Sequence, residues 1–147
     1  MRLLVMQRCI VYNKRNIPLE KIMNAKKKMI LVAEDSGPLL NDLKTIFTEE
    51  GYGVITASNG DFALQKALTE HPDLILLDIL MPRKDGMAVL QELRRDGWGK
   101  HVNVIMLTNL SDTEKMKDAK TLGAKEYLVK SDIRLEEVLA KVNNLLA

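Results

Sequence analysis

The sequence predicts a single α/β domain in which a parallel β-sheet carries helices on both faces. Its 147 residues are enough for one domain with a real core and too few for two ordinary domains. From Met29 onward, short apolar runs alternate five times with stretches whose apolar residues recur at helical spacing. Because each right-handed crossover lays its helix against the sheet, five such units predict helices on both faces.

The predicted strands are short, continuous runs rich in Ile, Leu and Val, which is typical of strands buried on both faces. In chain order they cover residues 29–33, 53–57, 74–79, 102–107 and 127–129. The third run is the most apolar of them and carries a carboxylate, Asp78, at its end. That position makes Asp78 the first candidate for a reactive residue.

The predicted helices are the stretches with apolar residues three and four positions apart. In chain order they cover residues 38–51, 62–69, 86–95, 111–123 and 135–146. Ser36 is expected to cap the first, and Ser111 with Glu114 has the spacing of a capping box for the fourth. Gly51 and Gly123 are natural stops at helix C-termini.

Composition favours a soluble globular protein, with 46% hydrophobic and 29% charged residues. Cys9 is the only cysteine, so an intramolecular disulfide is impossible and a cytoplasmic location is expected. No apolar run approaches the ~20 residues of a membrane span. We therefore expect a cytoplasmic protein without a membrane span.

Charge is distributed unevenly along the chain. Residues 1–28 contain eight Lys or Arg and one Glu, a net charge of +7, whereas the remainder has 14 basic and 19 acidic residues, a net charge of −5. The acidic body argues against direct binding of nucleic acid. Residues 1–28 are interpreted as a flexible or non-native extension, as an extra element packed on the domain, or as a basic docking arm. Residues 29–147 are expected to form the domain, with no room for an effector domain after Ala147.

Reactive side chains follow four of the predicted strands. Ligands of open α/β sheets bind beyond the carboxyl ends of the strands, so we expect these side chains to meet at one edge. They are Glu34 and Asp35 after the first strand, Asp78 in the third, Thr108 after the fourth and Lys130 after the fifth. The set therefore predicts one functional site.

The chemistry of this set favours phosphoryl transfer to a carboxylate. Three crowded carboxylates repel one another unless cations compensate, and Mg²⁺ prefers such oxygen ligands. Lys130 supplies a point charge for Asp78 and then for a phosphoryl oxygen, while Thr108 offers a hydroxyl donor. A carboxylate can act as the nucleophile and form an acyl phosphate, and Asp78 is the best placed.

The sequence resembles the receiver domains of two-component response regulators. The resemblance extends from Met29 to Ala147 and rests on motifs in a specific order. The matching pieces are Glu34-Asp35, Leu77-Asp78, Met81-Pro82, Asp85-Gly86, Leu107-Thr108 and Tyr127-Leu128-Val129-Lys130.

This resemblance implies a flavodoxin-like five-stranded sheet in the order 2-1-3-4-5. It implies that Asp78 accepts a phosphoryl group from a sensor histidine kinase or a phosphotransfer protein. Mg²⁺ would be held by Asp35, Asp78 and the Leu80 backbone carbonyl, with Glu34 assisting through water. Thr108 and Tyr127 would change position and remodel the face of the fourth helix, the fifth strand and the last helix for a downstream protein partner. A homodimer formed through that face on phosphorylation stays an open alternative.

Three departures from the family pattern bear on rate and signalling. Ser131 follows the lysine where proline is common, so we expect a trans peptide bond, with Ser131 or Asp132 capping the last helix. Asn109 is bulkier than the residue often found after the switch threonine. Leu80 and Leu110 place apolar side chains beside the site and predict slow autodephosphorylation.

The sequence favours a stand-alone receiver, which is not an enzyme for external substrates, over three other functions. An aspartyl-nucleophile phosphohydrolase commonly has a second acid two residues after the nucleophile, where this chain has Leu80. A flavin- or nucleotide-binding module would face repulsion between its phosphate and the pair Glu34-Asp35. An interaction domain without phosphorylation is disfavoured because the complete site is present.

Overall fold

The computed structural model describes residues 9–24, 27–109 and 112–146. Five parallel strands form one sheet in the order β2-β1-β3-β4-β5, which confirms the expected topology. The strands are β1 (Met29–Ala33), β2 (Gly53–Ala57), β3 (Leu74–Leu77), β4 (Asn103–Thr108) and β5 (Glu126–Val129). Strand β3 is shorter than predicted and ends one residue before Asp78.

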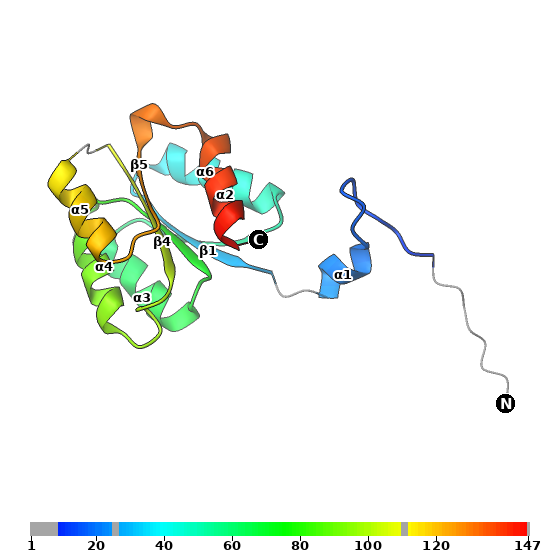
Figure 1. Cartoon of the computed structure of the whole chain (residues 1–147), viewed down its shortest axis with the longest axis horizontal. Helices are drawn as coiled ribbons and strands as arrows, with labels where there is room; N and C mark the ends of the chain where they lie inside the picture. The colour runs from blue at the N-terminus through cyan, green and yellow to red at the C-terminus, as the bar shows by residue number, and fades with distance from the viewer. Residues whose placement is uncertain (1–8, 25–26, 110–111, 147) are drawn as a thin grey trace.

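Helices cover both faces of this sheet, as the sequence predicts. Figure 1 shows α2 and α6 on one face and α3, α4 and α5 on the other. The helices are α1 (Leu19–Asn24), α2 (Gly37–Glu49), α3 (Gly60–Glu70), α4 (Gly86–Arg95), α5 (Thr113–Thr121) and α6 (Leu135–Leu146), and a 3₁₀ turn covers Lys130–Asp132. The five predicted helices are α2 to α6, and α1 is additional.

The core consists of two apolar layers, one on each face of the sheet. On the α3–α5 face, Ala63 and Ala67 of α3 let that helix approach the sheet closely, and Leu90 and Leu93 of α4 fill the layer beside it. On the other face, α2 and α6 bury their apolar stripes against alternate residues of β1, β3 and β4. The central strand β3 is buried along its whole length, so its carboxyl end is held firmly.

Side-chain caps fix the starts of three helices. Asn59, Asp85 and Asp112 accept hydrogen bonds from free backbone N–H groups at the starts of α3, α4 and α5. The capping box predicted for the fourth helix is wrong, because Asp112 takes the cap position; Ser111 lies outside the described residues. Ser36 occupies the cap position of α2, but its side chain makes no capping hydrogen bond.

The segment after Lys130 has the expected trans peptide bond but does not cap the last helix. No cis peptide bond occurs among the described residues, so the bond before Ser131 is trans as expected. Lys130 to Asp132 form the 3₁₀ turn, and α6 begins only at Leu135. The prediction that Ser131 or Asp132 caps the last helix is therefore wrong, because both residues belong to this separate turn.

Residues 9–24 form a turn followed by the short helix α1, beside the sheet domain (Figure 1). Tyr12 and Pro18 form an isolated antiparallel bridge, and the Asn13 side chain accepts the backbone N–H groups of Arg15 and Ile17. Arg15 in this turn donates to Glu50 Oε1 over 2.7 Å, at the end of α2. One ion pair therefore joins this segment to the sheet domain.

Candidate phosphoacceptor site

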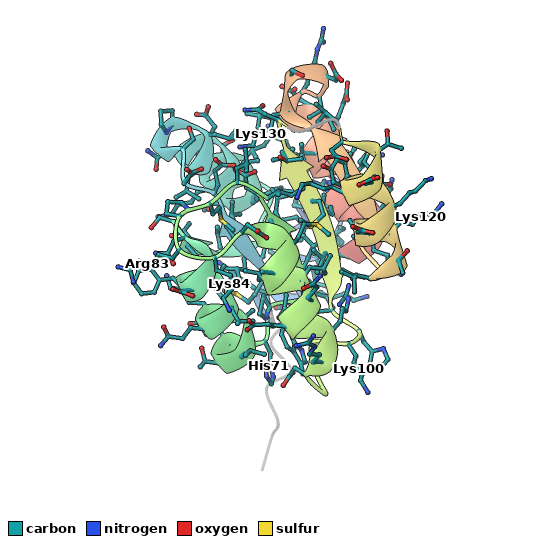
Figure 2. All side chains as sticks on the ribbon, turned by 90° about the vertical axis from the view of Figure 1, so that its left-hand side faces the viewer. His71, Arg83, Lys84, Lys100, Lys120 and Lys130 are labelled. Carbon is teal, nitrogen blue, oxygen red and sulfur yellow. The ribbon has the colours of Figure 1, made fainter. Side chains whose placement is uncertain are left out.

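Glu34 and Asp78 stand directly after β1 and β3, at the carboxyl edge of the sheet. Their backbones still belong to the ladder, because Glu34 N donates to Ala57 O and Asp78 N donates to Ala33 O, each over 3.0 Å. Figure 2 shows Lys130 at this end of the domain and His71 at the opposite end. The strands therefore hold both carboxylates in fixed places at one edge.

Three carboxylates lie together there, as predicted from the strand ends. One carboxylate oxygen each from Glu34, Asp35 and Asp78 lies within 4.8 Å of the others. Glu34 and Asp78 are buried, with 2% and 4% of their surface exposed, whereas Asp35 faces solvent. Such a cluster needs compensating positive charge.

Lys130 supplies part of that charge to both buried carboxylates. Its Nζ donates to Asp78 Oδ2 over 3.0 Å and forms an ion pair with Glu34 Oε2 over 2.6 Å. The contact with Asp78 agrees with the sequence analysis, whereas the contact with Glu34 was not predicted. The sequence shows Lys130 after the fifth strand, but its simultaneous contact with two acids depends on distances across the sheet.

Backbone N–H groups satisfy the other oxygens of the two buried acids. Asp78 Oδ1 accepts from Leu80 N over 3.3 Å, and Glu34 Oε1 accepts from Ser36 N over 3.0 Å. Each buried carboxylate therefore has one oxygen toward Lys130 and one toward its own loop. Hydrogen bonds of this kind favour the ionised form of a carboxylate and fix its orientation.

Burial and ion pairing act in opposite directions on the titration of Glu34 and Lys130. Burial raises the pKa of Glu34 above its ordinary value, although its contacts with Lys130 and Ser36 oppose this change. Burial lowers the pKa of Lys130, but its contacts with Glu34 and Asp78 outweigh burial, so that the pKa is raised. Lys130 therefore stays charged in the neutral range.

The loop from Asp78 to Gly86 turns back tightly against the end of β3. Gly86 N donates to Ile79 O over 2.8 Å, and a Cβ on Gly86 would lie 2.1 Å from the carbonyl oxygen of Asp78. Only glycine fits this approach. Leu80 lies in the same loop with 57% of its surface exposed, beside the acidic cluster rather than in the core.

Thr108 and Tyr127 are placed by the two strands on the other side of β3. Thr108 is the last residue of β4 and is fully buried. It pairs in register with Val129, the residue that precedes Lys130 in the chain. Tyr127 pairs with Met106 and packs against the apolar layer on the α3–α5 face. Burial, followed by the charges of Asp112 and Asp78, raises the pKa of Tyr127.

The fold and this acidic edge define the class of protein. Residues 30–143 match the family model of the response regulator receiver domain, and the chain belongs to this family. The family assignment confirms the resemblance found in the sequence.

The relatives include proteins named as transcriptional regulators. The chain is 39% identical over 124 residues to the probable transcriptional regulator ycf27 of Cyanophora paradoxa, which covers 84% of this chain and 50% of that protein. It is also 39% identical over 120 residues to the alkaline phosphatase synthesis transcriptional regulatory protein PhoP of Bacillus subtilis, covering 81% of this chain and 48% of that protein. The chain thus spans about half the length of these relatives.

Solved structures show the same architecture. The chemotaxis protein CheY4 of Vibrio cholerae superposes with a TM-score of 0.75 and 28% identity, covering 82% of this chain and 99% of that chain. The receiver domain of the Francisella response regulator 1452 gives a TM-score of 0.74 and 32% identity, covering 81% of this chain and 96% of that chain.

In the described part of the chain, we find no helix both long and apolar enough to cross a membrane.

Proposed function

We propose that the chain accepts a phosphoryl group on Asp78 in a Mg²⁺-dependent reaction and acts as a signalling switch. The observation that carries this proposal is the contact of Lys130 with a buried Asp78, beside Glu34 and the exposed Asp35. The placement combines a fixed nucleophile, a mobile cation and an acidic edge open to solvent at Asp35. Membership of the receiver-domain family supports the same function.

The donor set at the acidic edge fits Mg²⁺. Glu34, Asp35 and Asp78 offer only carboxylate oxygens, which are hard ligands, and no sulfur or imidazole ligand belongs to the cluster. We assign Asp35, Asp78 and the Leu80 carbonyl as ligands, with Glu34 assisting through water. When bound, Mg²⁺ would add positive charge for the carboxylates and for the phosphoryl oxygens.

Asp78, Lys130 and Thr108 have different roles in the proposed phosphoryl transfer. A carboxylate oxygen of Asp78 forms the new bond to phosphorus while the bond from phosphorus to the histidine nitrogen of the donor breaks. The donor imidazole leaves with that bonding pair. Lys130 moves its charge from Asp78 Oδ2 toward a phosphoryl oxygen, and the Thr108 hydroxyl donates to another. These steps require positioning and charge rather than an additional acid or base.

The signal is proposed to pass through Thr108 and Tyr127 to the face of α5, β5 and α6. A phosphoryl group on Asp78 adds negative charge that draws the Thr108 hydroxyl, and the Tyr127 ring then repacks beside β5. The phosphoryl donor is a sensor histidine kinase or phosphotransfer protein, and the output requires a downstream protein. The only group transfers at the site are phosphorylation of Asp78 and its slow hydrolysis.

The proposed organisation is a receiver domain over residues 29–147 preceded by an extension over residues 1–28. The family match begins at residue 30, close to the proposed boundary. We propose a cytoplasmic location, where kinases and Mg²⁺ are available.

Intact-mass spectrometry with acetyl phosphate tests the function. The native chain should gain the mass of one phosphoryl group with Mg²⁺, and should gain none after chelation of the metal. Asp78→Asn should gain none in either condition, while Asp42→Asn on the exposed side of α2 serves as the matched control and should behave as the native chain. The same mass gain in Asp78→Asn would contradict the assignment, as would no gain with acetyl phosphate or a kinase donor.

A further inference from the structure

A basic segment precedes the sheet domain and lies outside its two helix layers. We define this basic segment as residues 9–24 together with Lys27 and Lys28. Figure 1 shows α1 and the turn before it standing apart from the helices that cover the sheet. Most of the described side chains of the segment face solvent, so its surface is available to a partner.

Hydrogen bonds give the turn in this segment a defined shape. Asn13 N donates to Ile17 O over 3.0 Å, and Leu19 N donates to Val11 O over 2.8 Å. Asn16 lies at the tip with a φ of 58°, a left-handed conformation in which asparagine is enriched. The turn therefore presents its side chains in a definite arrangement although little of it is buried.

Large apolar side chains of this turn are exposed to solvent. Ile10, Val11 and Tyr12 have 50%, 58% and 49% of their surface exposed, and Ile17 has 38%. In the described part of the chain, these are four of the eight large hydrophobic residues that are exposed to this degree. Their removal from water would be favourable, and their concentration in one turn indicates a binding surface.

The same segment is positively charged. Five basic residues and one acid give it a net charge of +4, whereas the chain from Met29 onward has a net charge of −5. Among the described residues, no carboxylate lies within ion-pair distance of its four lysines, which are Lys14, Lys21, Lys27 and Lys28. A complementary surface is therefore negatively charged.

The attachment of the segment determines how the domain would face such a surface. Arg15 contacts Glu50 over 2.7 Å, and Glu50 follows α2 just before β2 begins, at the amino edge of the sheet. Lys28 directly precedes β1 at the same edge. The acidic cluster lies at the opposite, carboxyl edge, so it would point away from an anionic surface and stay accessible.

We propose that the basic segment binds the surface of an anionic lipid membrane. Lipid phosphates would receive the lysines, and the boundary between headgroups and acyl chains would receive Ile10, Val11 and the amphipathic ring of Tyr12. A nucleic acid would pair with the lysines but leave the aliphatic side chains in water. This binding is a property beyond the proposed function and does not depend on phosphorylation of Asp78.

Flotation of the full, unmodified chain with lipid vesicles tests this proposal. The vesicles contain phosphatidylcholine and phosphatidylglycerol in equal amounts, and the control vesicles contain phosphatidylcholine alone. The chain should float with the anionic vesicles and remain in solution with the neutral ones. An ionic strength of about 1 M should lower the bound fraction, because the Debye length then falls to about 3 Å.

One pair of variants measures the contribution of charge. Lys14→Gln/Lys21→Gln should weaken partitioning onto the anionic vesicles about tenfold or more, because each lysine near such a surface contributes about fivefold. The matched variant Lys44→Gln/Lys120→Gln removes the same charge from exposed positions of α2 and α5. It should change partitioning less than about twofold, because those positions lie outside the segment.

A second pair of variants measures the contribution of apolar surface. Ile10→Gln/Val11→Gln leaves the charge unchanged and should weaken partitioning about fivefold or more, because two apolar side chains no longer enter the interface. The control Leu68→Gln/Met116→Gln changes two exposed apolar residues of α3 and α5 and should have less than about a twofold effect.

Three results would overturn the proposal. They are an absence of binding to the anionic vesicles, equal binding to both kinds of vesicle, and equal loss in the segment variants and their matched controls. A chain that ignores vesicles but binds labelled poly-glutamate or duplex DNA would identify a polyanion other than lipid as the partner. All of these outcomes leave the phosphorylation assay unaffected, so the two proposals fail separately.

Discussion

Lys130 Nζ lies 3.0 Å from Asp78 Oδ2 and belongs at the same time to an ion pair with buried Glu34. One ammonium group therefore serves two carboxylates that the strands β1 and β3 bring together. Two acids with a single shared cation leave net negative charge, to which the exposed Asp35 adds. The arrangement favours the arrival of a further cation at this edge.

Replacement of Glu34 by Gln should change how stability depends on pH. Burial raises the pKa of Glu34 above 4.5, so the folded chain retains this proton at pH values where the unfolded chain has lost it. The stability from this group is fully present below the unfolded pKa and is lost as pH rises through the folded pKa. From about pH 5 to pH 8, the free energy of unfolding of the native chain should therefore fall relative to that of Glu34→Gln.

Urea unfolding of both proteins across this range measures the difference. Glu34 contributes a destabilising charge at neutral pH in this account, because its ionised form is the one that burial disfavours. Parallel pH profiles for the two proteins would show that Lys130 and Ser36 compensate burial fully.

Leu80→Asn should shorten the lifetime of the phosphoryl group. Leu80 is exposed beside the acidic cluster and has no polar atom to orient a water molecule toward phosphorus. We expect an increase of about threefold or more in the rate of hydrolysis, since a positioned polar group assists water attack. The measurement follows loss of the phosphoryl mass after removal of the donor, with Leu80→Met as the apolar control. Equal rates in the native chain and Leu80→Asn would exclude this role of Leu80.

Arg94→Met should destabilise the fold by about 2–4 kcal/mol, because backbone carbonyls lose a charged donor. The Arg94 guanidinium donates to the carbonyls of Leu122, Gly99 and Val102 over 2.6, 2.6 and 2.9 Å, and so ties α4 to the end of α5. Burial lowers the pKa of this guanidinium. Chemical denaturation compares Arg94→Met with Arg95→Met. Arg95 is an exposed neighbour, and its replacement should lower the free energy of unfolding by less than about 0.5 kcal/mol. Similar losses for both variants would contradict the role of these hydrogen bonds.

Gly86→Ala should disturb the loop that carries the site. The new Cβ would meet the Asp78 carbonyl oxygen at 2.1 Å, so we expect a loss of about 3 kcal/mol or more in the free energy of unfolding. Gly37→Ala is the control, because a Cβ there has nothing within 4 Å and should change stability by less than about 1 kcal/mol. Equal thermal unfolding midpoints for the two variants would contradict this view of the loop.

Much of the fold and of the site could be predicted because both follow from local sequence patterns. Apolar runs identify β1 and β2 with their observed bounds, and glycine after Asp85 marks the start of α4. Since parallel strands end at one edge, the acids after β1 and β3 could be placed together without coordinates. The pairing of Lys130 with Asp78 followed from the same rule.

Other features depend on contacts between distant segments. Two of the Arg94 hydrogen bonds, to the carbonyls of Leu122 and Gly123, join residues far apart in sequence, and no local pattern marks a cation that binds carbonyls. The contact of Lys130 with Glu34 depends on side-chain reach across the sheet. Helix α1 has only six residues and follows a turn without a repeated apolar pattern, so residues 1–28 offered little local signal. The cap of α5 was misplaced by one residue because Ser111 and Asp112 are both good capping residues.

Chemical identification of the phosphorylated residue distinguishes Asp78 from the other carboxylates at the acidic edge. The native chain is treated with acetyl phosphate, then with sodium borohydride, which reduces an aspartyl phosphate to homoserine, and the digested peptides are sequenced by tandem mass spectrometry. Homoserine should be found at position 78 when Mg²⁺ is present and at no position when the metal is chelated. Homoserine at position 35 instead, or at no position with either acetyl phosphate or a kinase donor, would contradict the assignment of Asp78.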